Sequence, residues 1–95
     1  MLSQDTARRA AHLRELLETG TLYYRSRVSY GHGSVVDFDV AVRLALADLD
    51  YLILINRRGD HVAPDRWRRI GEEITHLHGL AVDRPPVALP GTGSP

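Results

Sequence analysis

The stretch LYYRSRVSYGHGSVVDFDVAV, residues Leu22–Val42, decides the fold that we expect for this chain. Apolar and polar residues alternate on both sides of Gly31-His32-Gly33, and such alternation is typical of half-buried strands. A three-residue loop that ends in glycine suits a hairpin with a type I turn and a bulge. The stretch therefore predicts an antiparallel β-hairpin.

The register of this hairpin follows from pairing Tyr30 with Ser34 across the loop. One face then becomes almost entirely apolar, through the pairs Val28–Val36, Ser26–Phe38, Tyr24–Val40 and Leu22–Val42. The other face joins unlike charges, through the pairs Arg27–Asp37 and Arg25–Asp39. A slip of one residue would mix the two faces, so the pattern specifies the pairing strongly.

The residues after the hairpin can be read in two ways. Leu44 and Leu46 continue the alternation and favour a long second strand, whereas the Ala- and Leu-rich residues 40–50 also fit a short helix. We expect the strand. Asp48–Asp50 is then a turn, and the apolar run Tyr51–Ile55 is a third strand.

A helix is expected on each side of these strands. Ser3–Glu18 begins with a serine that can cap it and is followed by Gly20, a typical residue just beyond a helix end. Asp65–His78 follows Pro64 and precedes Gly79, which we expect to end it. Its buried stripe is expected to consist of Trp67, Ile70, Ile74 and Leu77.

These elements predict an α+β fold in the order α-β-β-β-α, with an antiparallel three-stranded meander and two flanking helices. Residues 1–82 form the single domain, and residues 83–95 form a flexible tail rich in proline and glycine. The third strand is apolar on both faces and lies at the sheet edge, which soluble proteins usually cover. We expect a second copy of the chain to cover it, with an interface formed by Tyr51, Leu52, Ile53, Leu54 and Ile55.

Composition narrows the classes of function. Twelve basic residues, all arginine, balance 12 acidic residues, and this neutrality argues against general attraction to nucleic acid or anionic lipid. The chain has no cysteine, which excludes disulfides and thiolate chemistry. Its start does not resemble a signal peptide and its longest apolar run is too short for a bilayer. We expect a cytoplasmic protein with no membrane partner.

A local arginine cluster is the main candidate binding site. It consists of Arg57, Arg58, Arg66, Arg68 and Arg69, at a loop and the start of the second helix. Such a cluster can grip phosphate or nucleic acid, although nearby carboxylates dilute its charge. His32, between two glycines at the hairpin tip, is a second candidate for contact with a ligand.

Catalysis and metal binding find little support in the sequence. Glu73 and His76 have the Glu-x-x-His spacing of di-iron bundles, and His12 stands in a mirrored pattern. A solvated helix face explains these residues better, because a site needs several converging ligands. No nucleophile elbow or phosphate-binding glycine loop is present in the sequence. We expect a protein that is not an enzyme and needs neither metal nor cofactor.

Three functions remain open from the sequence. The favoured one is a homodimeric interaction or regulatory module with an unidentified protein partner. The alternatives are a nucleic-acid or phosphate binder and, last, a small metal protein or enzyme. The expected topology resembles that of double-stranded RNA-binding domains, which also carry a histidine in the first strand-to-strand loop. Those domains start their second helix with lysines, which this chain lacks, so we assign it to no family.

Overall fold

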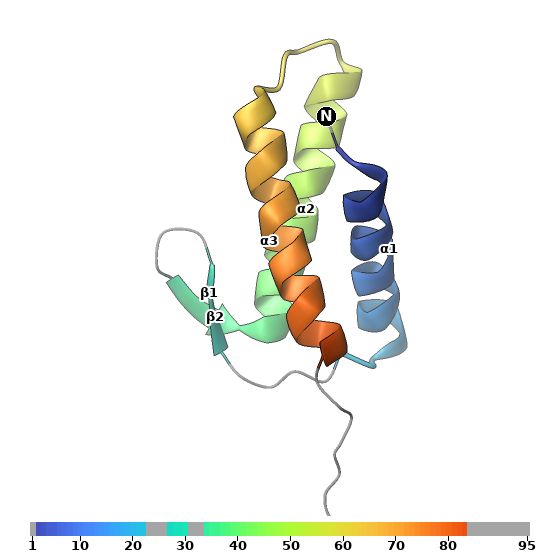
Figure 1. The fold of residues 1–95 in the computed structure, drawn as a ribbon, viewed down its shortest axis with the longest axis vertical. Coiled ribbons are helices and arrows are strands. Elements are labelled where there is room, and N and C mark those ends of the chain that lie inside the picture. The colour runs from blue at the N-terminus through green and yellow to red at the C-terminus, as the bar shows by residue number, and fades with distance from the viewer. Residues whose placement is uncertain (1, 23–26, 31–33, 84–95) are drawn as a thin grey trace, which may run out of the picture.

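The computed structural model of the chain describes residues 2–22, 27–30 and 34–83. Its elements run in the order α1 (Gln4–Thr19), β1 (Arg27–Tyr30), β2 (Ser34–Asp37), α2 (Phe38–Arg57) and α3 (Pro64–Asp83). The three helices lie side by side, and the hairpin stands beside one end of them (Figure 1). Over the described residues the protein is a small, mostly helical α+β domain with one two-stranded antiparallel sheet.

The expected three-stranded meander is wrong, because the order is α-β-β-α-α. Residues 38–57, which were expected to complete the second strand and form the third, are one continuous helix of 20 residues. The question left open for residues 40–50 is therefore answered as helix. Of the expected tail, Asp83 is the last residue of α3, and residues 84–95 lie outside the described residues.

Helix α1 begins and ends as its sequence predicts. The side chain of Ser3 accepts a hydrogen bond of 3.1 Å from the backbone N–H of Thr6, which makes it the N-cap. Gly20 takes the left-handed conformation, with φ of 70°, and the N–H of Thr21 donates to the carbonyl of Leu16 at 2.9 Å. This is a Schellman motif, in which glycine avoids the steric cost of a positive φ.

The hairpin has the predicted register, but it is shorter than expected. Arg27 pairs with Asp37, Val28 with Val36, and Tyr30 with Ser34. The chain then enters α2, so the expected partners Phe38, Val40 and Val42 are helical and the pairs assigned to them are wrong. Asp39 is also helical and forms an ion pair with Arg43 at 3.9 Å. Its expected partner Arg25 lies outside the described residues.

Helix α2 forms because its apolar residues recur with helical spacing as well as in alternation. Seven of its residues at this spacing are buried: Phe38, Ala41, Val42, Ala45, Leu46, Leu49 and Leu52. A strand would have placed only some of them on one face, whereas the helix buries them all. The helix ends at Arg57, and beyond its C-cap Arg58 the residue Gly59 has a φ of 91° and lets the N–H of Asp60 donate to the carbonyl of Ile55 at 3.1 Å.

Helix α3 confirms the predicted stripe and extends beyond its predicted end. Trp67, Ile70, Ile74 and Leu77 are all buried. The helix continues through Gly79 to Asp83, so the expectation that this glycine ends it is wrong. Leu80 and Ala81, which follow Gly79, pack partly buried against the core. Their burial favours one further turn over a helix end.

One hydrophobic core takes buried residues from every element except β2. It contains Ala10 and Leu13 of α1, Val28 of β1, seven residues of α2, Val62, and the four stripe residues of α3. Leu13, Ile74 and Leu77 are completely buried. Helix α2 is the central contributor, because it contacts α1, α3 and both strands.

Candidate functional site

The outward side of α2 carries a row of exposed apolar residues. Val40 is 38% exposed, Leu44 42%, Tyr51 55% and Leu54 47%. Ala47 is also exposed and lies between them in the same row. Successive members are separated by four, three, four and three residues, the heptad spacing of helices that pack along one seam. We call Val40, Leu44, Ala47, Tyr51 and Leu54 the α2 stripe.

The α2 stripe lies opposite the face that α2 gives to the core. At 100° per residue, its members cluster around one direction, and buried residues such as Val42, Leu49 and Leu52 cluster around the opposite one. Scattered exposed apolar residues are ordinary on a protein surface, but a continuous row of them along a helix marks an interaction surface. Helix α2 is thus apolar on two opposite faces.

Charged residues border the α2 stripe on both sides. Arg43, Asp50 and Arg57 follow one side at intervals of seven residues, and Asp48 stands on the other. Asp50 forms an ion pair with Arg14 of α1 at 2.5 Å. Arg43 has the longer contact with Asp39 described above, and both of these side chains are more than half exposed. The α2 stripe is therefore bordered by charged side chains that can form ion pairs with a partner surface.

Asp48 also fixes the hairpin to α2. The hydroxyl of Tyr30 in β1 donates a hydrogen bond of 2.5 Å to its carboxylate. Burial, this hydrogen bond and the negative charges of Asp48 and Glu73 all raise the pKa of Tyr30 above its ordinary value, burial most of all. The phenol is thus held neutral, as a donor to the carboxylate must be.

A hollow of about 260 Å³ lies around this contact. Its lining comes from β1, α2 and α3 and consists of Tyr30, Asp48, Leu52, Arg66, Arg69, Ile70 and Glu73. One carboxylate oxygen of Glu73 is buried there with no hydrogen-bond partner among the described residues. Arg66 and Arg69 line the same hollow, so positively charged side chains lie near the carboxylates of Asp48 and Glu73.

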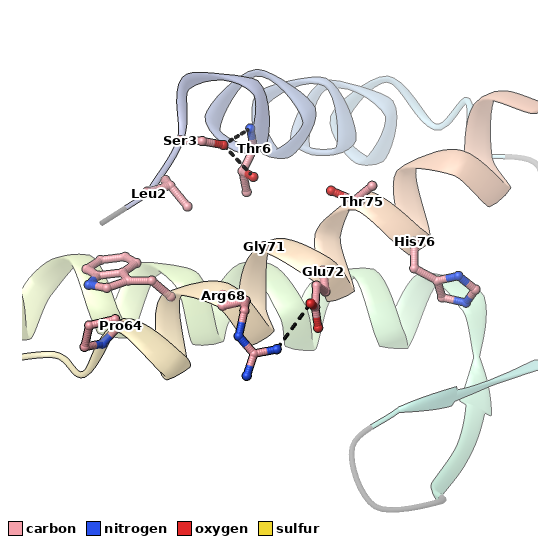
Figure 2. A pocket seen from close by; sticks show the side chains of 10 residues that line it. Leu2, Ser3, Thr6, Pro64, Arg68, Gly71, Glu72, Thr75 and His76 are labelled. Atoms are coloured by element: carbon pink, nitrogen blue, oxygen red, sulfur yellow. Dashed lines mark hydrogen bonds and ion pairs between the residues drawn. The ribbon is translucent and has the colours of Figure 1, made fainter.

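A second and larger hollow, of about 660 Å³, lies between the start of α1 and α3 (Figure 2). Its lining consists of Leu2, Ser3, Thr6, Pro64, Trp67, Arg68, Gly71, Glu72, Thr75 and His76. Four of its polar side chains are engaged in pairs: Ser3 bonds Thr6, and Arg68 pairs with Glu72 at 3.3 Å (Figure 2). It is an open groove rather than a site with converging reactive groups.

The predicted arginine cluster divides into two groups. Arg57 is the last residue of α2 and Arg58 follows it, both exposed. Arg66, Arg68 and Arg69 lie in the first turns of α3, where Arg68 and Arg69 both form ion pairs with Asp65. Hydrogen bonding and attraction from Arg68 lower the pKa of the Asp65 carboxyl.

The predicted metal-binding residues do not come together. His12 of α1 lies next to His78 of α3, with 2.9 Å between a ring nitrogen of each. His76 lines the groove of Figure 2, and Glu73 lines the hollow beside Tyr30. Among residues 2–22, 27–30 and 34–83, no three potential ligands are grouped to hold a metal ion. The other predicted contact residue, His32, lies outside these residues.

The predicted interface run Tyr51–Ile55 is divided by the helix. Tyr51 and Leu54 lie on the α2 stripe, Leu52 is buried in the core, and Ile53 and Ile55 are partly buried. The sequence analysis missed Val40, Leu44 and Ala47, because it assigned them to a strand. The signal that identifies them is the spacing of four and three residues, which continues from Val40 to Leu54 without interruption.

Comparison with known proteins gives no further guide to the function. No protein-family model matches the sequence, and no match to it was found among the curated proteins or the solved structures. None of the described helices has the length and apolar character needed to cross a membrane. The α2 stripe is accordingly judged on its own geometry.

Proposed function

We propose that this protein is a non-enzymatic interaction module that works as a homodimer, in which a second copy of the chain covers the α2 stripe. The observation that supports it is the exposed row of Val40, Leu44, Ala47, Tyr51 and Leu54 on the side of α2 away from the core. A row with this spacing packs well against an identical row, because residues of one helix fill the spaces between residues of the other.

The size of the chain also favours association. A chain of 95 residues has a small core, and symmetric association is a common way for such chains to bury further apolar surface. A helix of 20 residues offers about 30 Å of contact length. The stripe alone is narrower than a standard protein interface, so we expect a reversible dimer with a dissociation constant of about micromolar order.

The alternatives have less support in the geometry. Ion pairs with Asp65 partly neutralise Arg68 and Arg69, which weakens the proposal of a phosphate or nucleic-acid site. His12, Glu73 and His76 stand in three different surroundings, which weakens the proposal of a metal protein or enzyme. Neither these arginines nor His12, Glu73 and His76 identify a protein that the dimer would bind.

The test is the molar mass of the whole chain by light scattering over a concentration series, with variants of the stripe. We expect a dimer at about 100 µM that dissociates on dilution. Leu44→Glu puts a charge in the middle of the stripe and should give a monomer with unchanged helical circular dichroism. Val82→Glu is the matched control, because Val82 is an exposed apolar residue of α3 outside the stripe, 45% exposed.

Two results would contradict the proposal. One is a monomer at every concentration of the unaltered chain. The other is a dimer that Leu44→Glu leaves intact while Val82→Glu disrupts it, since the contact would then lie elsewhere on the molecule.

A further inference from the structure

We infer that the two copies of α2 lie parallel and in register in this dimer, with Arg43 of each copy facing Asp48 of the other. The inference rests on the proposed function and specifies the partner surface. It follows from the spacing of the α2 stripe and the charges that border it, because only the parallel arrangement pairs all five stripe residues and it also brings unlike charges together.

In the parallel arrangement each stripe residue meets its own counterpart. The five layers are Val40, Leu44, Ala47, Tyr51 and Leu54, each against the same residue of the second copy. Along such a pair, a residue on the Arg43 side of one stripe faces the residue five positions later on the other helix. Arg43 therefore faces Asp48, and twofold symmetry makes this contact twice. The next such position pairs Asp50 with Ile55, which opposes no like charge.

In an antiparallel arrangement, no alignment engages all five stripe residues. When Leu44 meets Leu54 and Ala47 meets Tyr51, Val40 faces Arg58. Residues on one side of the stripe of one helix then face residues on the same side of the stripe of the other helix. Asp50 faces its own counterpart, Arg43 faces Arg57, and Asp48 faces its own counterpart, so every bordering charge meets a like charge. Like charges side by side disfavour an interface. Sliding the helices by one heptad pairs Val40 with Tyr51 and Arg43 with Asp50, but it leaves Leu54 without a stripe residue opposite it.

The side chains concerned are able to make the parallel contacts. The side chain of Arg43 is 63% exposed, and its contact with Asp39 is long, at 3.9 Å. Asp48 is exposed and accepts a hydrogen bond from Tyr30 on one of its two carboxylate oxygens. The other oxygen is available to a guanidinium from a second copy, because a carboxylate can accept several hydrogen bonds.

Cysteine cross-linking tests the arrangement directly, since the chain has no cysteine of its own. In the parallel dimer, Val40→Cys and Leu54→Cys each place two identical cysteines in one layer, so mild oxidation should give a disulfide-linked dimer from each variant alone. In the antiparallel dimer the introduced thiols would be about 27 Å apart in Val40→Cys and about 15 Å apart in Leu54→Cys, at 1.5 Å per residue. Disulfides need Cα atoms within about 7 Å. Val82→Cys is the control and should not cross-link.

A charge reversal gives an independent result whose sign depends on the arrangement. Arg43→Asp places a carboxylate against Asp48 in the parallel dimer, and we expect the dissociation constant to rise about tenfold at low salt. In the antiparallel alignment that pairs Leu44 with Leu54, the same change replaces the Arg43–Arg57 repulsion by attraction and would tighten the dimer. In the alignment one heptad away it would replace an Arg43–Asp50 attraction by repulsion, so there the cross-linking result decides. Arg43→Gln is the control for the loss of the positive charge alone.

The outcomes separate this inference from the proposed function. A monomer in light scattering contradicts the proposed dimer itself. A dimer that cross-links only when Leu44→Cys and Leu54→Cys chains are mixed, or only when Val40→Cys and Tyr51→Cys chains are mixed, keeps the dimer and overturns the parallel arrangement, and in the first case Arg43→Asp tightens it. Cross-linking of Val40→Cys and Leu54→Cys alone, with weakening by Arg43→Asp, supports both.

Discussion

At the scale of single residues, two glycines that each follow an apolar helical pattern have opposite roles. Gly20 has a φ of 70° beyond the end of α1, whereas Gly79 is an ordinary helical residue of α3. A Cβ added at either position would meet no atom within 4 Å, so the backbone alone decides the effect. Both were expected to end helices, and only the first does so.

We expect the corresponding alanine variants to change stability in opposite directions. Gly20→Ala forces alanine into the left-handed region and should lower the free energy of unfolding by about 1 kcal/mol. Gly79→Ala removes flexibility within a helix and should raise it by about 0.5–1 kcal/mol. Urea unfolding at one fixed protein concentration measures both. Destabilisation by Gly79→Ala equal to that by Gly20→Ala would show that α3 ends at Gly79 after all.

At the scale of elements, a hydrogen bond from Tyr30 to Asp48 helps to hold the hairpin against α2. Tyr30 must stay protonated to donate to Asp48, and its pKa is raised in the folded state. The stability that this contact contributes is fully present below the unfolded-state pKa of about 10 and is lost as the pH rises through the folded-state pKa. The hairpin should therefore be stable at neutral pH and weaken under alkaline conditions.

The variant Tyr30→Phe tests this contact. We expect it to lower the free energy of unfolding by about 1 kcal/mol at neutral pH, because one hydrogen bond is lost. It should also flatten the decline in stability that the unaltered chain shows above about pH 10, measured by urea unfolding as a function of pH. Tyr51→Phe removes an exposed phenol instead and should retain that decline. An equal alkaline decline in Tyr30→Phe would show that another group causes it.

The elements differ in how far their sequences predict them. In α1 and α3 the apolar residues form one stripe and the capping residue Ser3 marks a start, so the helices are evident from periodicity. The hairpin register follows from the unlike charges of Arg27 and Asp37 and from the loop glycines. These signals are local, and each depends on residues close together in the chain.

The sequence of α2 misleads because the helix is apolar on two faces. Phe38 and Val42 belong to the buried face and Val40 and Leu44 to the α2 stripe, so together they alternate with polar residues as a strand would. The choice between the two structures depends on burial against α1 and α3, which a single stretch does not contain. Because α2 is apolar on two faces, the sequence did not identify Val40, Leu44 and Ala47 as part of the candidate site. Only Tyr51 and Leu54 were recognised as interface residues, and for a different element.

At the scale of the whole molecule, α2 contributes one face to the core and the opposite face to the protein surface. One face supplies seven of the core residues and joins α1, α3 and the hairpin. The opposite face carries the α2 stripe, which nothing in the described part of the chain covers. A parallel pair of such helices would place both hairpins at the same end of the dimer, because the hairpin adjoins the start of α2 (Figure 1).

The most direct test of the central claim is an isotope-filtered NOE measurement on an equal mixture of labelled and unlabelled chains. Such a spectrum reports only contacts between copies. We predict cross-peaks between the methyl groups of Leu44 in the two copies, and likewise for Val40 and Leu54. A dimer in solution whose intermolecular cross-peaks arise only from other surfaces, such as Val35 or Val82, would contradict it.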